Sequence, residues 1–392
     1  MDKTINTLEI GHNGVKLVIG YQIEHKPVVL YANTFHYEKS VENGEIVEPI
    51  VVANAIKALL KNVAETLNII VEDVVLALPA IDLEIFVGRQ QTSVLAAKVD
   101  KVDVTNVTTL LRKSKIDAQK QIVSIVPINF SLESGKSFYS APIGEPSTLL
   151  SLDAYLHLLP LWIYNSYINV VENAGIKVLK TFAETYALGE LYNRQKDVAT
   201  NYVLIDFGAE RTSVSLIAQN RLFFSKSFKL GSYHLTAHIS QKLNISLEKA
   251  EELKRIYGFD TSPIKTKFAI AKRDDEVGTK ISTNQLNEVI NEFLLIHQRN
   301  LDDTLAIMAK VQQINALKDY QMIITGGGTK LHGYQTFLAR EGHGYNYIFA
   351  QANIIGARNP EYATCLGLIK AYTRYAMEIG DEQTPVGPLS RK

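Results

Sequence analysis

The stretch "MIITGGGTKLHGYQTFLAR", residues 322–340, sets an apolar run against three consecutive glycines and then a helix-like segment. This pattern predicts a strand that ends before Gly326 and a helix that starts near Tyr334. Glycine loses more backbone entropy on folding than other residues, so we expect something to come very close to the main chain here. Glycines between a strand and a helix form a place where an adenosine or a phosphate can lie on bare backbone. The candidate contacts are Gly326, Gly327, Gly328 and Lys330.

Two other stretches share one design, which suggests an internal duplication. Residues 5–20, "INTLEIGHNGVKLVIG", and residues 202–217, "YVLIDFGAERTSVSLI", each run from an apolar strand through acid-x-Gly and a short polar turn into a second apolar strand. Asp206 in the second stretch stands where Glu9 stands in the first. Alternating apolar residues bounded by Gly and Asn are typical of hairpins. The repeat therefore predicts a duplicated domain with a cleft between the halves.

The two turns are candidate phosphate sites. A glycine at a turn lets backbone N–H groups approach and surround phosphate oxygens. The carboxylates of Glu9 and Asp206, at the strand ends, would hold a hydrated Mg²⁺ or orient a water, because Mg²⁺ keeps most of its water ligands. The alternative is that both are ordinary β-turns with acids at strand ends. The candidate residues are Glu9, Gly11, His12, Asn13 and Gly14 in the first turn, and Asp206, Gly208, Ala209, Glu210 and Arg211 in the second.

A fourth element, "ISLEKAEELKRIYG" at residues 245–258, has the signals of a helix. Ser246 can cap its start and Gly258 can end it. Glu251 and Lys254 are three residues apart, hence on one face. A carboxylate there can accept from both ribose hydroxyls while the lysine lies along the base. The alternative is a surface ion pair, which is common and contributes little.

These four elements, in this order, resemble the nucleotide-binding fold of actin, Hsp70 and the sugar kinases. Further stretches narrow the resemblance to FtsA, the bacterial cell-division actin homologue: "IVSIVPINFSLESGKSFYSAPIG" at residues 122–144 and "NPEYATCLGLIKAY" at 359–372. The similarity covers roughly residues 5–375. It implies an α/β fold of duplicated actin-like, ribonuclease H-like domains that flank a nucleotide cleft, with an inserted SHS2-like sub-domain 1C in place of the actin sub-domain 1B.

The resemblance also implies how the chain is divided. The 1C insert is expected to begin at "EDVVLALPAIDLEIFVGRQ", and its strand-rich pattern contains one helical stretch, "DVTNVTTLLRKSKIDAQ". The expected parts are 1A at residues 1–71 and 164–198, 1C at 72–163, 2A at 199–229 and, with a closing helix, at 308–375, 2B at 230–307, and a tail at 376–392.

In FtsA, sub-domain 1C contacts the neighbouring protomer of a filament, and 2B binds the C-terminal tail of the tubulin-like protein FtsZ. The resemblance therefore implies self-polymerisation through 1C and FtsZ binding through 2B, beside other division proteins. The helix "INEFLLIHQRNLDDTLAIM", residues 290–308, places Arg299 and Asp302 on the family's Arg-x-x-Glu pattern. Arg299 can bind an acidic tail by charge-assisted hydrogen bonds. The alternative is a solvated helix face.

The phosphate turns depart from the family pattern. The first turn usually offers a hydroxyl and a lysine after its glycine, and residues 12–14 are His, Asn and Gly instead. Lys16 lies two residues further on, and strand alternation alone leaves open whether it faces the turn. In the second turn Glu210 adds a negative charge, which Arg211 can offset.

The resemblance implies ATP and Mg²⁺ as cofactors. Each lost hydrogen bond to a charged oxygen costs ~1.5–3 kcal/mol, and each ~1.4 kcal/mol is tenfold in affinity. The eroded turns therefore weaken ATP binding, while the adenosine side keeps its glycines, Glu251 and Lys254. Asp206 acting through water is the one candidate for catalysis. We expect nucleotide binding with slow or absent hydrolysis, and enzymatic activity stays open.

The composition is that of a globular protein without excess charge. Hydrophobic residues make up 46%, and 41 basic residues balance 41 acidic ones, which argues against bulk attraction to nucleic acid or anionic lipid. The single cysteine, Cys365, excludes an internal disulfide framework, fits a reducing compartment and lies in an apolar stretch that predicts a core thiol. Pro160 and three polar residues interrupt the uncharged stretch at 154–171, which predicts a buried strand and a core helix instead of a membrane span.

The two ends of the sequence bear on location. The stretch "MDKTINTLEIG" has no uninterrupted apolar region typical of a signal peptide. FtsA normally ends in a linker and a basic amphipathic helix that lies on the membrane, whereas residues 381–392, "DEQTPVGPLSRK", have no apolar stripe. Either the chain is shortened or a partner supplies membrane attachment. We expect a cytoplasmic protein at the division septum, on the inner face of the cell membrane.

Three functions fit these patterns. The first is an FtsA-like protein that binds ATP, polymerises and links FtsZ filaments to the division site during septum formation. The second is a PilM-like cytoplasmic platform of a type IV pilus or secretion machine, which has the same 1C insert. The third is a small-molecule kinase on the same fold, which needs a catalytic acid aimed at a substrate hydroxyl. The stretches "IVPINF" and "APIG" favour the first function.

Overall fold

A computed structural model describes residues 4–114, 117–259, 269–272, 280–350, 352 and 354–380. The chain divides into two units. The first unit runs up to Asn193 and resumes at Ala352, and the second comprises Arg194–Gln351. Each unit folds around its own sheet.

The first unit is built on a sheet with the strand order β11-β6-β1-β2-β3. Its strands are β1 (Ile5–Gly11), β2 (Gly14–Ile23), β3 (Lys26–His36), β6 (Asp73–Leu78) and β11 (Lys177–Ala183). The first three form an antiparallel meander, and the last two add in parallel. Apolar residues alternate along β1 and β2, which places the facing pair Leu8 and Leu17 in the core.

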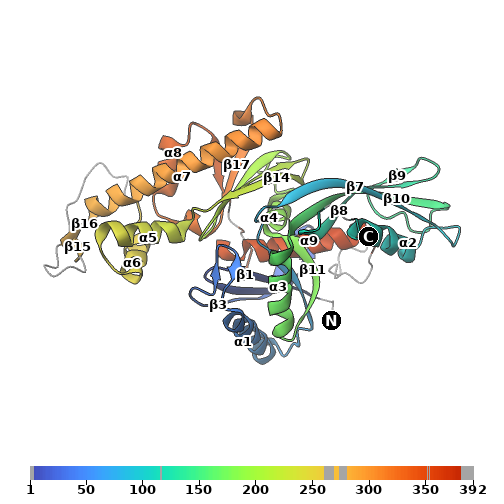
Figure 1. Ribbon diagram of the computed structural model, residues 1–392, viewed down its shortest axis with the longest axis horizontal. Helices are drawn as coiled ribbons and strands as arrows, with labels where there is room; N and C mark the ends of the chain where they lie inside the picture. The colour runs from blue at the N-terminus through green and yellow to red at the C-terminus, as the bar shows by residue number, and fades with distance from the viewer. Residues whose placement is uncertain are drawn as a thin grey trace. The chain divides into compact units, whose positions relative to one another are not determined.

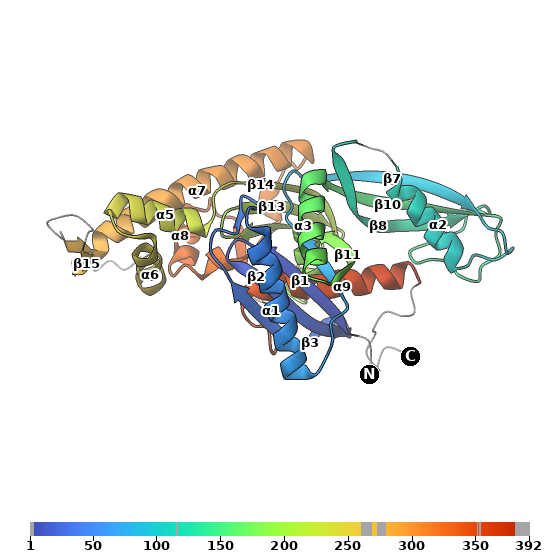
Figure 2. The same cartoon turned by 60° about the horizontal axis from the view of Figure 1, so that its bottom comes forward.

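Helices cover both sides of this sheet. On one side α1 (Pro49–Leu67) packs with α3 (Leu161–Asn173), and on the other α9 (Ala363–Glu378) packs with α4 (Glu184–Tyr192), as Figures 1 and 2 show. β4 (Val41–Glu42) and β5 (Glu45–Ile46) form a small hairpin. In the described part of the chain, no helix is long and apolar enough to cross a membrane.

A smaller sheet, in the order β7-β10-β8-β9, is inserted between β6 and α3. Its elements are β7 (Glu84–Ser93), α2 (Lys101–Arg112), β8 (Lys120–Leu132), β9 (Ser137–Phe138) and β10 (Leu149–Pro160). Asp100 caps α2 by accepting hydrogen bonds from the N–H groups of Val102 and Asp103. The predicted strand-rich pattern with one helix is confirmed. The buried strand and the core helix predicted at 154–171 are also confirmed, as β10 and α3. The equivalence of the inserted sheet to sub-domain 1C stays a prediction.

Two expected boundaries differ in the structure. β6 lies inside the range expected for the insert, 72–163, but it pairs with β1 and β11 in the main sheet, because its run of apolar residues is buried on both faces. The closing helix α9, expected with the second half, belongs to the first unit. Arg374 Nη1 lies 2.6 Å from Glu190 Oε1, and Lys370 donates to the Leu191 carbonyl at 2.9 Å, so polar contacts hold α9 against α4.

The second unit repeats the sheet plan of the first. Its strands are β12 (Tyr202–Phe207), β13 (Thr212–Ala218), β14 (Arg221–Phe228), β17 (Gln321–Thr325) and β18 (Asn346–Phe349), in the order β14-β13-β12-β17-β18. Again an antiparallel meander is followed by two strands that add in parallel. The meander and the parallel strands follow one another along the chain as they do in the first sheet, so the predicted duplication is confirmed.

Helices of the second unit pack around this sheet. They are α5 (Ser232–Leu243), α6 (Leu247–Tyr257), the long α7 (Thr283–Val311) and α8 (Tyr334–Glu341), with the short strands β15 (Ala269–Lys272) and β16 (Lys280–Ser282) and the turn η1 (Leu317–Asp319). α7 packs on β13 and β14. Ser246 caps α6 by accepting from the Lys249 N–H, and the helix ends before Gly258, as predicted.

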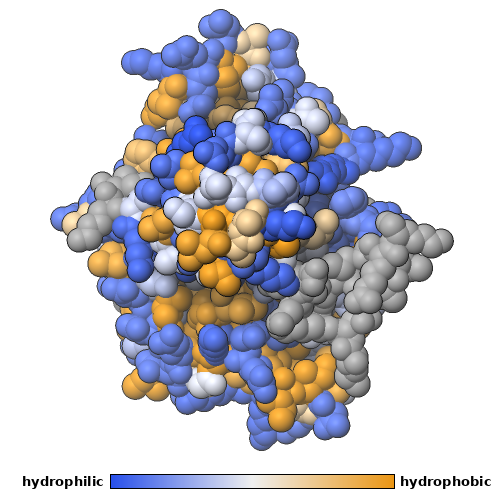
Figure 3. Space-filling view, turned by 90° about the vertical axis from the view of Figure 1, so that its right-hand side faces the viewer, coloured by the Kyte–Doolittle hydropathy of each residue, from blue (hydrophilic) through white to orange (hydrophobic). Residues whose placement is uncertain are grey.

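The inserted sheet exposes apolar side chains. Val87 on β7, Leu95 beyond it and Val102 on α2 are 66%, 92% and 63% exposed. Figure 3, a view from the side where this sheet lies in Figure 1, shows apolar side chains gathered between hydrophilic ones. Within the described residues β7 is an edge strand, so one row of its backbone groups is open to pairing. These features are typical of a surface that contacts other proteins.

Each unit buries a histidine. Ser124 Oγ lies 2.8 Å from His157 Nδ1 in the first unit, and Thr212 Oγ1 lies 2.9 Å from His297 Nε2 in the second. Burial lowers the pKa of both imidazoles to about 3, from an ordinary value of 6.5. Both rings are therefore neutral at physiological pH.

Stability should fall as the pH drops below about 6.5. There the unfolded chain protonates these histidines, whereas the folded chain does so only near pH 3, so the unfolded state binds more protons and is favoured. Each histidine contributes about 1.4 kcal/mol per pH unit to the slope. Urea unfolding between pH 7 and pH 5 measures it. His157→Phe should lose some stability at pH 7, because Ser124 loses its partner, but its slope should be flatter. A slope equal to that of the wild type contradicts the assignment.

Candidate functional site

The turn between β12 and β13 rests on the start of α5. The Gly208 N–H donates to the Arg211 carbonyl at 2.9 Å, which closes the turn. The Ser232 N–H donates to the Gly208 carbonyl at 3.0 Å, and the Tyr233 N–H donates to the Ala209 carbonyl at 2.8 Å. Amide groups in the first turn of a helix have no partner within the helix, so the turn satisfies them. The turn is thereby held in one position on α5.

Residues 326–328, called the glycine loop below, follow β17, the strand next to β12 in the sheet. Gly326 has φ +95°, and a β-carbon on it would lie 2.3 Å from Asp206 Oδ1 and 2.5 Å from the Phe207 carbonyl oxygen. A β-carbon on Gly328 would lie 2.5 Å from the Phe207 ring. The close approach that the sequence predicts is therefore made by the end of β12.

Gly327 has different surroundings from its two neighbours. It begins η2 (Gly327–Lys330). Apart from its chain neighbours and the backbone of this turn, no described atom lies within 4 Å of the position of its β-carbon. Lys330 is exposed at the other end of this turn. Packing thus accounts for Gly326 and Gly328, and Gly327 leaves bare backbone on which a ligand can lie.

The predicted pair Glu251 and Lys254 joins α6 to α5. Glu251 Oε2 and Lys254 Nζ are 2.6 Å apart, and the buried Thr236 donates to Glu251 and accepts from Lys254. Lys254 also donates to the Ser232 carbonyl at 3.1 Å, and Arg255 Nε donates to Glu251 Oε1 at 2.8 Å. Burial alone raises the pKa of Glu251, but Lys254, Thr236 and Arg255 outweigh it and the net pKa is lowered. The pair is part of a half-buried network that a surface ion pair would lack.

These segments lie next to one another within the second unit. Ser232 binds the turn through its N–H group and Lys254 through its carbonyl. Beyond α6, the Phe259 N–H donates at 2.9 Å to the carbonyl of His332, just past the glycine loop, and its ring lies 6.0 Å from that of Phe337 on α8. A bare backbone, a carboxylate and a lysine are groups that suit a nucleoside with phosphates.

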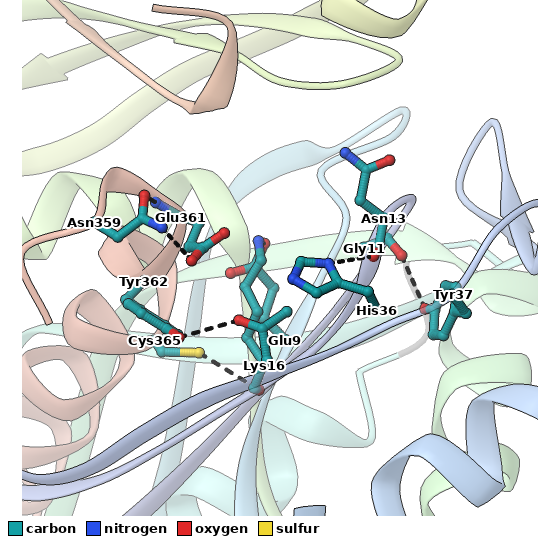
Figure 4. A network of polar contacts seen from close by, with 11 residues as sticks. Glu9, Gly11, Asn13, Lys16, His36, Tyr37, Asn359, Glu361, Tyr362 and Cys365 are labelled. Atoms are coloured by element: carbon teal, nitrogen blue, oxygen red, sulfur yellow. Dashed lines mark hydrogen bonds and ion pairs between the residues drawn. The ribbon is translucent and has the colours of Figure 1, made fainter. Parts of the chain in front are cut away.

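The first turn joins β1 and β2 in the first unit (Figure 4). Glu9 stands directly opposite Lys16 in the register, and Lys16 Nζ donates to Glu9 Oε1 at 2.7 Å. Lys16, whose direction the sequence leaves open, therefore lies on the same face as Glu9. Burial alone lowers the pKa of Lys16, but the Glu9 carboxylate outweighs it and the net pKa is raised. The turn thus carries a charged ammonium beside its acid.

Neighbouring residues fix this turn from two directions (Figure 4). Tyr37 donates to the Gly11 carbonyl at 2.9 Å, and His36 Nδ1 lies 3.1 Å from the Asn13 carbonyl. His12 Nδ1 lies 2.9 Å from the carbonyl of Val41 in β4. These contacts give the turn a defined shape.

The start of α9 approaches the same turn from the other direction, just after η3 (Pro360–Tyr362). Cys365 Sγ lies 3.8 Å from the Lys16 carbonyl. The thiol is fully buried, and burial raises its pKa. Cys365 is therefore the core thiol that the sequence predicts.

Neither turn forms a metal centre from protein groups alone. Among the described residues, no group of three His, Cys, Asp or Glu side chains is placed to hold a metal ion. Glu9 Oε2 is buried and has no hydrogen-bond partner in the described part of the chain, which leaves one carboxylate oxygen for a water or a cation. A Mg²⁺ ion near Glu9 or Asp206 would therefore keep its waters and bind mainly to nucleotide phosphates.

Arg299 and Asp302, predicted as a partner-binding pair on α7, have different surroundings. Asp302 accepts from Gln298 Nε2 at 2.9 Å, and its other oxygen lies 2.9 Å from His343 Nε2. Arg299 is exposed and makes no hydrogen bond or ion pair with any other described residue. Asp302 is thus engaged within its own unit, and Arg299 is available to a partner.

Comparison of the sequence with known proteins finds proteins similar to this chain. A family model described as "Cell division protein FtsA" matches residues 203–367. FtsA of Enterococcus hirae is 28% identical over 371 residues, which cover 92% of this chain and 81% of the relative. This chain is FtsA-like. FtsA of Staphylococcus epidermidis is 22% identical over 376 residues, 93% of this chain and 78% of that protein. These FtsA relatives confirm the resemblance and support the cell-division interpretation more than the PilM-like one.

Solved structures show the same fold. The PilM-PilN type IV pilus biogenesis complex contains a chain with a TM-score of 0.61 and 17% identity, covering 93% of this chain and 97% of that one. MreB5 of Spiroplasma citri, bound to ADP, has a TM-score of 0.56 and 13% identity, covering 96% of this chain and 98% of that one. At these identities the likeness of this chain to the two structures is one of fold, and it confirms the predicted actin-like class.

Sequence reasoning missed residues that hold these segments together. Ser232 and Thr236 lie four residues apart on α5 and both contact Lys254. The dipeptide Gly-Ser after a strand signals a helix start, and a hydroxyl four residues on lies on the same face, so this pattern could have pointed to them. Counting back from the facing residues Gly11 and Gly14 of the hairpin places Lys16 opposite Glu9.

The three glycines should respond differently to a methyl group. Gly326→Ala should destabilise the second unit by about 2–4 kcal/mol, because the β-carbon meets Asp206 and the Phe207 backbone at a strained φ. Gly327→Ala should change stability by less than about 1 kcal/mol, because its position is open. Thermal unfolding compares the two variants. Equal losses of stability would show that Gly327 is as enclosed as Gly326.

Proposed function

We propose that this FtsA-like chain is an actin homologue of bacterial cell division that binds ATP with Mg²⁺. The observation that carries the proposal is the arrangement in the second unit, where the open backbone at Gly327 adjoins the turn 208–211 and the Glu251–Lys254 pair. The adenosine would lie along residues 326–328, with Lys330 at its edge. The ADP-bound MreB5 structure supports a nucleotide for this fold.

The hydrogen bonds of Glu251 limit what it offers a ribose. A carboxylate has about four acceptor positions. Thr236 and Lys254 occupy Oε2, and Arg255 occupies one position on Oε1. One position therefore remains, so we propose that Glu251 accepts from one ribose hydroxyl and not from two.

Phosphate contacts are proposed for both turns. In the first unit Lys16 supplies a positive charge, with Gly11, His12, Asn13 and Gly14 as backbone neighbours. In the second unit Arg211 offsets the charge of Glu210, and both are half-buried in the turn. Asp206 lies against Gly326, which holds its carboxylate at the strand end. We propose that it orients a water or the hydration shell of Mg²⁺, and that hydrolysis is slow or absent.

ATP binding should depend on the open glycine. Gly327→Ala, which keeps the fold, should weaken ATP binding at least about tenfold, because its methyl group takes the place of the adenosine. Calorimetry with ATP, ADP and GTP in the presence of Mg²⁺ measures this. Gly344→Ala is a control, because its position in the loop after α8 is also open. Gly344 has φ +71°, so this variant should lose some stability but keep the ATP affinity of the wild type. Equal ATP affinities for the wild type and Gly327→Ala would rule out this binding position.

A partner surface is proposed on α7. Arg299 is exposed without an internal acid to pair with, and an acidic C-terminal tail such as that of FtsZ would complement it. Asp302 is proposed to contribute indirectly, by fixing the packing of α7 through Gln298 and His343. Partner selection in this proposal depends on one arginine.

Arg299→Ala should weaken binding of the FtsZ tail by about 10- to 100-fold, the effect of losing a charge-assisted hydrogen bond. Co-sedimentation with FtsZ, and with FtsZ that lacks its C-terminal tail, tests the contact. Lys310→Ala is the matched control, because Lys310 is an exposed cation on the same helix. Equal pelleting with both FtsZ forms contradicts the proposal.

Assembly and location follow from the same proposal. The exposed apolar residues and the edge strand of the inserted sheet are a suitable contact for a second copy of the chain, as expected for sub-domain 1C. We propose that the chain works at the inner face of the membrane at the septum, where a partner or an amphipathic helix holds it. Of the tail expected at residues 376–392, residues 376–378 belong to α9 and residues 381–392 lie outside the described residues.

A pilus platform is the second candidate, because the PilM-PilN complex has the same fold at a TM-score of 0.61. The FtsA relatives favour division. A small-molecule kinase is a third candidate. Phosphoryl transfer from ATP to a small alcohol, catalysed by this chain, would support it. Binding of FtsZ, with no binding of a PilN-type peptide, separates the first two candidates.

A further inference from the structure

One buried histidine contacts residues that hold both the turn 208–211 and the glycine loop of the second unit. His297, on the inner side of α7, has no exposed surface. Its ring lies 4.4 Å, between centroids, from the ring of Phe207, and Phe207 is the residue against which Gly326 and Gly328 pack. At its edge, Nε2 lies 2.9 Å from Oγ1 of Thr212, the first residue of β13 after the turn.

The hydrogen bonds determine the tautomer of His297. Thr212 Oγ1 donates its single proton to the Leu230 carbonyl at 2.8 Å. It must therefore accept from His297, so Nε2 carries the ring proton. Nδ1 is then an acceptor, and it is buried with no hydrogen-bond partner among the described residues. Because burial lowers the pKa of the ring to about 3, the ring is neutral in this arrangement.

Packing alone does not call for a histidine here. Aromatic rings surround His297 at centroid distances of 4.4–6.5 Å: those of Phe207, Phe228, Phe293 and Tyr334. A phenylalanine would fill this space without leaving a buried ring nitrogen unsatisfied, which is destabilising. What the histidine adds is the N–H group that reaches Thr212.

We propose that His297 is a positioning residue for nucleotide binding, which holds the turn 208–211 through Thr212 and the glycine loop through Phe207. The inference rests on the proposed function. Without the bond to Thr212, the turn and the loop are no longer fixed to a common support. Part of the binding free energy is then spent on ordering them, and affinity falls.

The test uses the 392-residue chain and four variants: His297→Phe, Thr212→Val, the double variant, and Thr212→Ser as a control that keeps the hydroxyl. Calorimetry with ATP and Mg²⁺ gives the dissociation constants, and thermal unfolding gives the stabilities. Each of the first two changes should weaken ATP binding about fivefold, the effect of one neutral hydrogen bond. Both changes remove the bond between His297 and Thr212, and Thr212→Val also removes the bond to the Leu230 carbonyl. The double variant should therefore be no weaker than Thr212→Val. Thr212→Ser should bind ATP as the wild type does.

A spectroscopic measurement provides a second readout. Side-chain ¹⁵N spectra of the wild type should show His297 with a protonated Nε2 and an unprotonated Nδ1, and this signal should shift on addition of ATP. His297→Phe identifies the signal. A protonated Nδ1, or a signal that ATP leaves in place, contradicts the inference.

The outcomes separate the inference from the proposed function. ATP affinity that is unchanged in His297→Phe and in Thr212→Val, with only a lower melting temperature, makes His297 a structural core residue and overturns the inference alone. Additive losses in the double variant overturn it as well. If His297→Phe fails to fold, Thr212→Val decides, because it keeps the shape of the side chain. A wild-type chain that binds no nucleotide overturns both.

Discussion

The second unit depends on a contact that leaves no room for a side chain. Where β17 ends, the backbone at Gly326 runs against the Asp206 carboxylate and the Phe207 carbonyl, and a methyl group there would overlap both. The parallel pairing of β12 with β17 brings these two strand ends together. Because Gly326 can sit so close, η2 begins at the carboxyl edge of the sheet, where open α/β sheets bind their ligands. On its other side, the Phe207 ring packs against His297 of α7, with the ring centroids 4.4 Å apart.

Local patterns in the sequence predict the elements of this fold well. The alternation around Glu9 and around Asp206 predicts both hairpins, and Ser246 and Gly258 predict the ends of α6. Hydrogen bonds close in sequence determine these features, so a short window contains the information. The sequence predicts the glycine loop for the same reason, because the strand, the three glycines and the helix follow one another within a short stretch of the chain.

Features that depend on distant pairing could not be predicted. The sequence shows that something approaches Gly326, but only the pairing of β12 with β17 shows that it is Phe207. Thr236 becomes important because α5 packs on α6, and the place of α9 follows from its contacts with α4. Lys16 is an intermediate case, because the hairpin register that orients it is short enough to count by hand.

Because α7 is long, its packing at His297 bears on the position of its distant end. The helix has 29 residues, with a length of about 43 Å at ~1.5 Å per residue. His297 lies near its middle, about 21 Å from its first residue. A tilt of α7 by ~5° about His297 would displace its first residue, which follows β16, by roughly 2 Å. A small change in packing beneath the glycine loop would therefore shift a part of the second unit that lies far from the loop.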